Sequence, residues 1–161
     1  MDQATLKSWL VYHPETGLFT WLRSRGNNIL AGQQAGHLQL DGYVRLKFFN
    51  KQYLISRLAV LYMTGEMPAE VDHVDRNPSN NQWTNLRVCT RSQNRCNRPK
   101  TVKNTSGFKG VHWDRLSKKW RAQIGLYGKI KHLGRFATRE EAAKAYERAA
   151  KTLHGEFVCT T

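Results

Sequence analysis

The sequence lacks any hydrophobic run long enough to cross a membrane. Its longest apolar run extends from Leu58 to Met63, whereas a membrane-spanning helix needs about 20 apolar residues. The first residues, MDQATLKSW, contain neither a basic segment nor an apolar one, so they do not resemble a secretion signal. We therefore expect a cytoplasmic protein with no membrane partner.

Cysteine is also scarce, with three in 161 residues and no CxxC pair. Cys89, Cys96 and a nearby histidine are conceivable zinc ligands, but their spacing matches no common zinc motif. Reduced thiols in the cytoplasm are the simpler interpretation. Apolar residues are plentiful at 40% of the chain, so the sequence can bury the core of one ordinary domain or of two small ones.

Acidic residues are almost absent from one stretch of the chain. Between Arg87 and Arg135 there are fourteen Lys or Arg residues and a single acid, Asp114, and this stretch holds thirteen of the fourteen excess positive charges. A block so one-sided repels itself unless it binds a polyanion. A solvated basic face is the alternative, but aromatic residues are interleaved with the charges. Double-stranded DNA is therefore the expected partner, bound in a salt-sensitive way.

The hydrophobic pattern of residues 1–70 predicts two helices and several short strands. A short amphipathic helix carries Leu6, Trp9 and Leu10 on one face, and strands are expected at GLFTWL, HLQL, YVRLKFF and QYLI. A second helix, capped by Ser56, should end at Gly65. Residues 70–98 then predict a strand, a turn-rich loop, a second strand and a helix.

The residues after the segment RPKTVKNTSG predict three strands and a helix. The strands are FKGVHW, KWRAQIGL and KIKHLGRF, and the helix extends from Thr138 to Leu153, beginning with a capping box at TREE. Within KWRAQIGL, Arg121 and Gln123 alternate with apolar residues. The apolar set should pack on the helix, so Arg121 and Gln123 should point to the open face of the sheet.

The stretch VDHVDRNPSNNQWTNLRVCTRSQN carries the residues expected to do chemistry. Asp72 and His73 end its first strand, Asn85 follows His73 by twelve residues, and Asn94 comes nine residues later on the helix. A hard cation such as Mg²⁺ prefers oxygen ligands, and a histidine near its own pKa can take a proton from water. We predict that Asp72 and Asn94 hold the metal, that His73 is the general base, and that Asn85 bonds across the loop to orient His73. The remaining asparagines of the loop are interpreted as turn formers: Asn77, Asn80 and Asn81.

This stretch resembles the HNH endonuclease family, whose members share a ββα-metal active site. The resemblance covers residues 57–98, and it implies metal ligation by Asp72 and Asn94, a general base at His73 and a structural role for Asn85. The upstream segment SRLAVLYMTGEMP is also similar, although many relatives have histidine in place of Ser56. The segment YHPETGLFTW is similar to the leaders of phage homing-type members.

The C-terminal section resembles the plant ethylene-response-factor (Apetala-type) DNA-binding domain over most of residues 105–157. In that family a three-stranded sheet lies in the major groove and is backed by one helix. The recognised sequence cannot be transferred, because His132 stands where the plant domains usually have Trp and Ile130 where many have Arg. By matched position, the residues that would face DNA are Lys109, His112, Arg121, Gln123 and His132, with Lys119 and Lys131 as candidates for phosphate contacts.

These features predict an α+β protein in which a ββα-metal nuclease module precedes a three-stranded antiparallel sheet packed on one helix. The expected parts are an N-terminal β-rich region (1–55), a nuclease core (56–98), a basic linker (99–104) and the DNA-binding domain (105–161). Basic side chains near the linker are expected to contact DNA: Arg91, Arg95 and Arg98.

The predicted function is hydrolysis of a DNA phosphodiester at a preferred site with Mg²⁺ or Mn²⁺, by a homing-type enzyme that acts as a monomer and nicks one strand. The main alternative is a sequence-specific DNA-binding protein without cleavage activity. A non-specific toxin or degradative nuclease is a weaker alternative. The complete set of metal and base residues favours cleavage, and the C-terminal section favours choice of a site.

Overall fold

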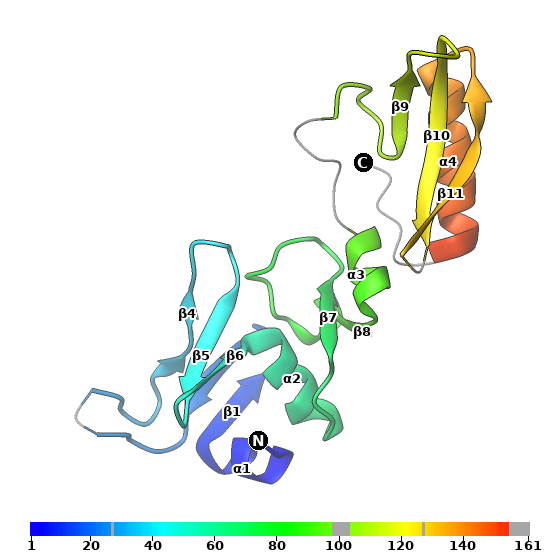
Figure 1. Cartoon of the computed structure of the whole chain (residues 1–161). Helices are drawn as coiled ribbons and strands as arrows, with labels where there is room; N and C mark the ends of the chain where they lie inside the picture. Colours follow the sequence, from blue (N-terminus) through cyan, green and yellow to red (C-terminus); the bar gives the residue numbers. More distant parts are fainter. Residues whose placement is uncertain (27, 98–103, 127, 155–161) are drawn as a thin grey trace. The chain divides into compact units, whose positions relative to one another are not determined.

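Helices and antiparallel strands occur throughout the chain, which confirms the predicted α+β class. The computed structural model describes residues 1–26, 28–97, 104–126 and 128–154. The chain divides into two units, Met1–Thr90 and Arg91–Thr161. Its elements in chain order (Figure 1) are α1 Gln3–Trp9, β1 Leu10–His13, β2 Leu18–Trp21, β3 Gln34–Ala35, β4 His37–Leu38, β5 Val44–Phe48, β6 Lys51–Leu54, α2 Ile55–Thr64, β7 Glu70–His73, the 3-10 helix η1 Trp83–Asn85, β8 Leu86–Cys89, α3 Arg91–Cys96, β9 Val111–Asp114, β10 Lys119–Leu126, β11 Lys129–Phe136 and α4 Arg139–His154.

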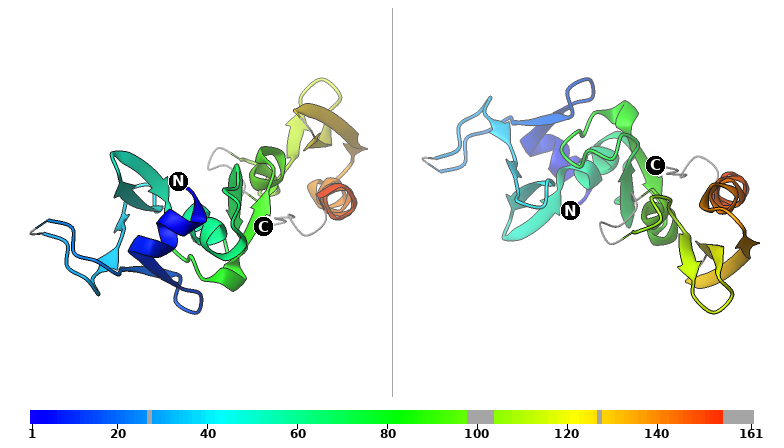
Figure 2. Two further views of the ribbon diagram at one scale, coloured as in Figure 1. Left: turned by 90° about the horizontal axis from the view of Figure 1, so that it is seen from below. Right: turned by 90° about the horizontal axis from the view of Figure 1, so that it is seen from above.

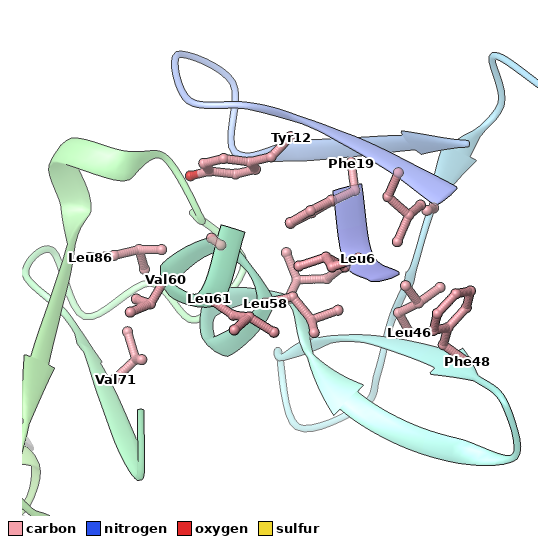
Figure 3. Close-up of a cluster of buried hydrophobic side chains, with 14 of the residues drawn as sticks. Leu6, Tyr12, Phe19, Leu46, Phe48, Leu58, Val60, Leu61, Val71 and Leu86 are labelled. Carbon is pink, nitrogen blue, oxygen red and sulfur yellow. The ribbon is translucent and has the colours of Figure 1, made fainter. Parts of the chain in front are cut away.

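The first unit is built around α2, whose sequence is apolar on almost every side. Leu58 and Leu61 are buried, as the periodicity predicted. Figure 3 shows apolar side chains from the β1–β2 pair, from β5 and from the β7–β8 pair converging on this helix. Val71 and Leu86 belong to this cluster, so the core fixes β7 and β8 on one side of α2. The strand that carries Asp72 and His73 is therefore anchored to the main hydrophobic core of the unit.

Two local predictions for this unit were wrong. Helix α2 begins at Ile55 with Leu54 at its N-cap position, no side chain caps it, and Ser56 is buried inside the helix. Strand β6 continues directly into α2, so the N-cap position is taken by Leu54, whose apolar side chain cannot accept a hydrogen bond. Similarly, Leu10 begins β1 instead of extending the first helix.

The second unit contains the predicted three-stranded antiparallel sheet, in the order β11-β10-β9, with α4 packed on one face (Figures 1 and 2). Strands β10 and β11 coincide with the predicted segments KWRAQIGL and KIKHLGRF. The capping box is confirmed, because Glu141 N–H donates to Thr138 Oγ1 (3.2 Å) and Thr138 N–H donates to the Glu141 carboxylate (3.3 Å). Within the described ranges, no helix has the length and apolar character needed to cross a membrane.

Candidate functional site

Asp72 and His73 lie side by side at the end of β7, and both are buried, with 4% and 5% of their surfaces exposed. Strand β7 pairs with β8 so that Asp72 faces Arg87 and His73 faces Leu86 across the hairpin. Ionisable side chains are rarely buried without a partner. Two adjacent ones at a strand end therefore mark a polar site that the fold has built into the edge of the core.

Arg87 is the charged partner of Asp72. Its Nε and Nη2 atoms lie 2.8 Å and 2.6 Å from Asp72 Oδ2, and its side chain is 16% exposed. Both residues sit on neighbouring strands in direct register. The guanidinium thus fixes the orientation of the Asp72 carboxylate from the strand opposite.

Replacing Arg87 with Met should destabilise the first unit by about 3 kcal/mol, because it leaves the buried Asp72 carboxylate without its charged partner. Adding Asp72→Asn to the same protein should recover part of this loss. Chemical unfolding of the wild type, both single variants and the double variant gives the coupling free energy between the two side chains. Strictly additive losses would contradict the ion pair.

His73 is held by a side chain that the sequence pattern assigned to the loop. Its Nε2 atom lies 3.2 Å from Asn81 Oδ1, and both residues are buried. The Asn81 amide nitrogen donates to the carbonyl oxygen of Ser79 (3.0 Å), which turns Oδ1 toward the imidazole. An amide oxygen can only accept, so Nε2 carries the proton in this contact and the basic lone pair belongs to Nδ1. The rings of Tyr43 and His73 pack edge to face, with their centroids 6.1 Å apart.

Asn85 organises the loop that follows His73, as a structural asparagine would. Its side-chain oxygen accepts from Asp75 N–H (3.0 Å), and its amide nitrogen donates to Asp75 Oδ1 (2.9 Å) and to the Asn80 carbonyl oxygen (2.7 Å). Asp75 also accepts from the backbone of Asn77 and the side chain of Asn80. Burial opposes ionisation of Asp75, but these hydrogen bonds outweigh it and lower its pKa. Asp75, which the sequence pattern did not single out, is thus a centre of the loop.

The N-terminal turn supports this loop from outside. The Tyr12 hydroxyl donates to the Asn81 carbonyl oxygen (2.7 Å), and Trp83 N–H donates to the Pro14 carbonyl oxygen (2.9 Å). Burial raises the pKa of Tyr12 to about 12, so its phenol stays protonated and able to donate. Gly17 lies against the backbone that joins Asn81 to Gln82, where a β-carbon would come within 2.3 Å of the Asn81 carbonyl carbon. Residues far apart in sequence therefore position the asparagine that holds His73.

The remaining predicted residues of this site lie on or after α3, in the second unit. Asn94 is partly buried on α3, and Arg91 is exposed at its start. The convergence of Asn94 with Asp72 on one metal ion stays a prediction. The Arg95 side chain, Arg98 and most of the linker lie outside the described residues. Among the parts of the chain that are described, no group of three or more His, Cys, Asp or Glu side chains could hold a metal.

The C-terminal sheet has a polar face opposite α4. Ala122 and Ile124 are buried toward the helix. Register places Arg121 beside His112 and Gln123 beside His132 on the other face, as the alternation predicted, and Lys119 shares the side of Arg121 on β10. Lys109 lies in the turn before β9, while Lys131 is exposed and opposes Ile124, on the helix side of the sheet. The contacts of these residues with DNA stay predictions.

Comparisons with known proteins match both parts of the chain. A family model described as HNH endonuclease matches residues 53–96, and one described as AP2 domain matches residues 106–156. Protein 3.8 of Escherichia phage T7 is 34% identical over 87 residues, which cover 54% of this chain and 71% of that protein.

Two further similarities are more distant. The uncharacterized HNH endonuclease L560 of Acanthamoeba polyphaga mimivirus is 30% identical over 123 residues, which cover 75% of this chain but less than two thirds, 63%, of that protein. A solved structure described as "DNA binding and cleavage by the HNH homing endonuclease I-HmuI" aligns over 97% of this chain and 90% of that chain, with a TM-score of 0.47 and 22% identity.

Proposed function

Because the chain belongs to the HNH endonuclease family, as its sequence predicted, we propose that it is a metal-dependent DNA endonuclease that cuts at a preferred site. The observation that carries the proposal is the buried pair of Asp72 and His73, in which each side chain is oriented by a specific partner. Buried carboxylate and imidazole groups held in this way cost stability, and they are typical of a catalytic site.

His73 is the general base in this proposal. Because Nε2–H donates to Asn81 Oδ1, Nδ1 is the atom that takes a proton from the attacking water. Asn81 fixes the tautomer and the ring orientation, and Ser79, Tyr12 and Gly17 fix Asn81 in turn. Asn85 acts one step further away, by shaping the loop that carries Asn81.

Asp72 and Asn94 would hold the metal ion. One carboxylate and one amide oxygen form a donor set that suits a hard cation such as Mg²⁺ or Mn²⁺, so the chemistry of these residues fits. When bound, such an ion neutralises charge on the scissile phosphate and on the leaving oxygen. Arg87 keeps the Asp72 carboxylate in one orientation from the opposite strand.

The C-terminal sheet would choose the site at which Asp72, His73 and Asn94 act. Its open face presents Arg121 and Gln123 on β10 beside His112 and His132 on the adjacent strands, and such side chains can bond to base edges in the major groove. The chain carries one set of Asp, His and Asn in the family's order. One set per chain supports nicking of a single strand by a monomer, in the manner of a homing-type enzyme.

A plasmid assay tests the function directly. With Mg²⁺ the protein should convert supercoiled DNA to nicked circles, and chelation of the metal with EDTA should abolish conversion, because the phosphate charge is then not neutralised. Asp72→Ala should lose activity at every Mg²⁺ concentration. Asp41→Ala, which removes an exposed carboxylate from the β4–β5 turn, is the matched control and should cut normally.

Two results would reject the proposal. Specific DNA binding without any cleavage in Mg²⁺ or Mn²⁺ would favour a DNA-binding protein that uses the nuclease fold as a scaffold. Cleavage ends mapped by sequencing and spread uniformly over the DNA would reject the preferred site.

A further inference from the structure

Two arginines stand next to each other on the open face of the C-terminal sheet. Arg121 on β10 and Arg135 on β11 are direct register partners, just before the irregularity between Ala122 and Gln123. Like charges placed directly opposite across two strands destabilise a sheet. The pair therefore needs either local compensation or a ligand rich in hydrogen-bond acceptors.

Each of the two arginines donates a hydrogen bond from Nε to a side chain on β9. Arg121 Nε–H donates to His112 Nε2 (2.8 Å), and Arg135 Nε–H donates to Asp114 Oδ2 (2.9 Å). Asp114 is 12% exposed and Arg135 is 55% exposed, so the acid is covered while the guanidinium faces solvent. These contacts use Nε, and each guanidinium has two further nitrogens that can donate hydrogen bonds.

The two arginines border a common hollow. Together with His132 and Gly134 they line a depression of about 380 Å³ on this face. None of these four residues is acidic, so the depression suits a group that offers hydrogen-bond acceptors. A planar arginine fork matches the O6 and N7 acceptors of guanine in the major groove.

We propose that Arg121 and Arg135 form a paired reader for two guanines, in which His112 positions Arg121 and Asp114 positions Arg135. The inference rests on the proposed function and deepens it, because it names the bases that the sheet selects and adds Arg135 to the residues that select them. Phosphate contacts are the other use of paired arginines, and they would carry no base preference.

The proposal predicts different base preferences for conservative variants of the full-length protein. Binding to a randomised DNA duplex library should show guanine enriched at two positions. Arg135→Lys should reduce the preference at one of them by about fivefold or more, and Arg121→Lys should do the same at the other, because lysine keeps the charge but loses the fork. Arg148→Lys on α4, away from the sheet face, is the matched control and should change neither position.

Variants of the positioning residues add a second test. Asp114→Asn should weaken the same guanine preference as Arg135→Lys, whereas His112→Phe should weaken the one assigned to Arg121. Burial, helped by the nearby Arg121 and His132 and opposed by Asp114, lowers the pKa of His112, so its neutral form accepts from Arg121 at neutral pH. Because this pKa lies below the ordinary histidine value, the pH must fall well below about 6.5 before His112 is protonated, and the Arg121-dependent preference should decline only there.

The other position serves as an internal reference for pH. Hydrogen bonds from Arg135 and Ser117 lower the pKa of Asp114 to about 2, so the preference that depends on Arg135 should persist over the same pH range. If both lysine variants kept the base preferences of the wild type, the arginines would be phosphate contacts and the inference would be overturned. If the protein bound no DNA duplex at any salt concentration, both the inference and the proposed action on DNA would be rejected.

Discussion

The His73→Ala protein is expected to cut plasmid DNA about 100- to 10,000-fold more slowly than the wild type, which is the usual contribution of a general base. The loss should be in the rate of cleavage, because His73 lies in the first unit and the proposed base-reading residues lie in the second. Single-turnover cleavage with excess enzyme separates this rate from the affinity for DNA.

Two comparisons keep this result specific to His73. His37→Ala removes an exposed histidine from β4 and should leave the rate unchanged. Because His73 is buried, circular dichroism and thermal unfolding must show that the variant is folded. A folded His73→Ala protein that cuts as fast as the wild type would remove His73 from the mechanism.

A single added methyl group at Gly17 should cost the first unit much of its stability. An added β-carbon would come within 2.3–2.7 Å of three backbone atoms of Asn81 and Gln82, and the residue has a φ of +74°. Gly17→Ala should therefore lower the free energy of unfolding by about 3 kcal/mol, from overpacking together with left-handed backbone strain. The same displacement should move Asn81 away from His73 and slow cleavage.

Gly32→Ala isolates the contribution of backbone strain. Gly32 has a φ of +85°, and nothing lies within 4 Å of a β-carbon built there. This variant should lose about 1 kcal/mol and retain full activity. Chemical unfolding and plasmid cleavage of both variants provide the comparison. If Gly17→Ala and Gly32→Ala lost equal free energy of unfolding, the close contact between Gly17 and the loop would contribute nothing to stability.

Local patterns in the sequence were sufficient to predict the strands in which polar and apolar residues alternate regularly. The polar and apolar residues of KWRAQIGL alternate strictly around Arg121, and β10 has the predicted bounds. The position of Asp72 and His73 at a strand end followed from the turn-rich composition of the next residues. In both cases the signal lies within about ten residues, where side-chain period and turn preference determine the backbone.

Contacts between distant segments could not be predicted in this way. Asn77, Asn80 and Asn81 have the same local preferences, so the sequence predicts a turn-forming role for all three. The burial of Asn81 against His73 depends instead on Tyr12 and Gly17, which are distant in sequence. The pairing of Arg135 with Asp114 spans 21 residues and reaches from one outer strand of the sheet to the other. Such partners are set by tertiary register, which no sequence window contains.

The support of the loop by the N-terminal turn also affects how the nuclease can be transplanted into a chimera. A fragment trimmed to residues 53–96, the extent of the family match, would contain Asp72, His73 and Asn81. It would omit the Tyr12 hydroxyl, the Pro14 carbonyl and Gly17, which contact the backbone of this loop. A chimera should therefore carry the N-terminal turn of Tyr12, Pro14 and Gly17 together with residues 53–96.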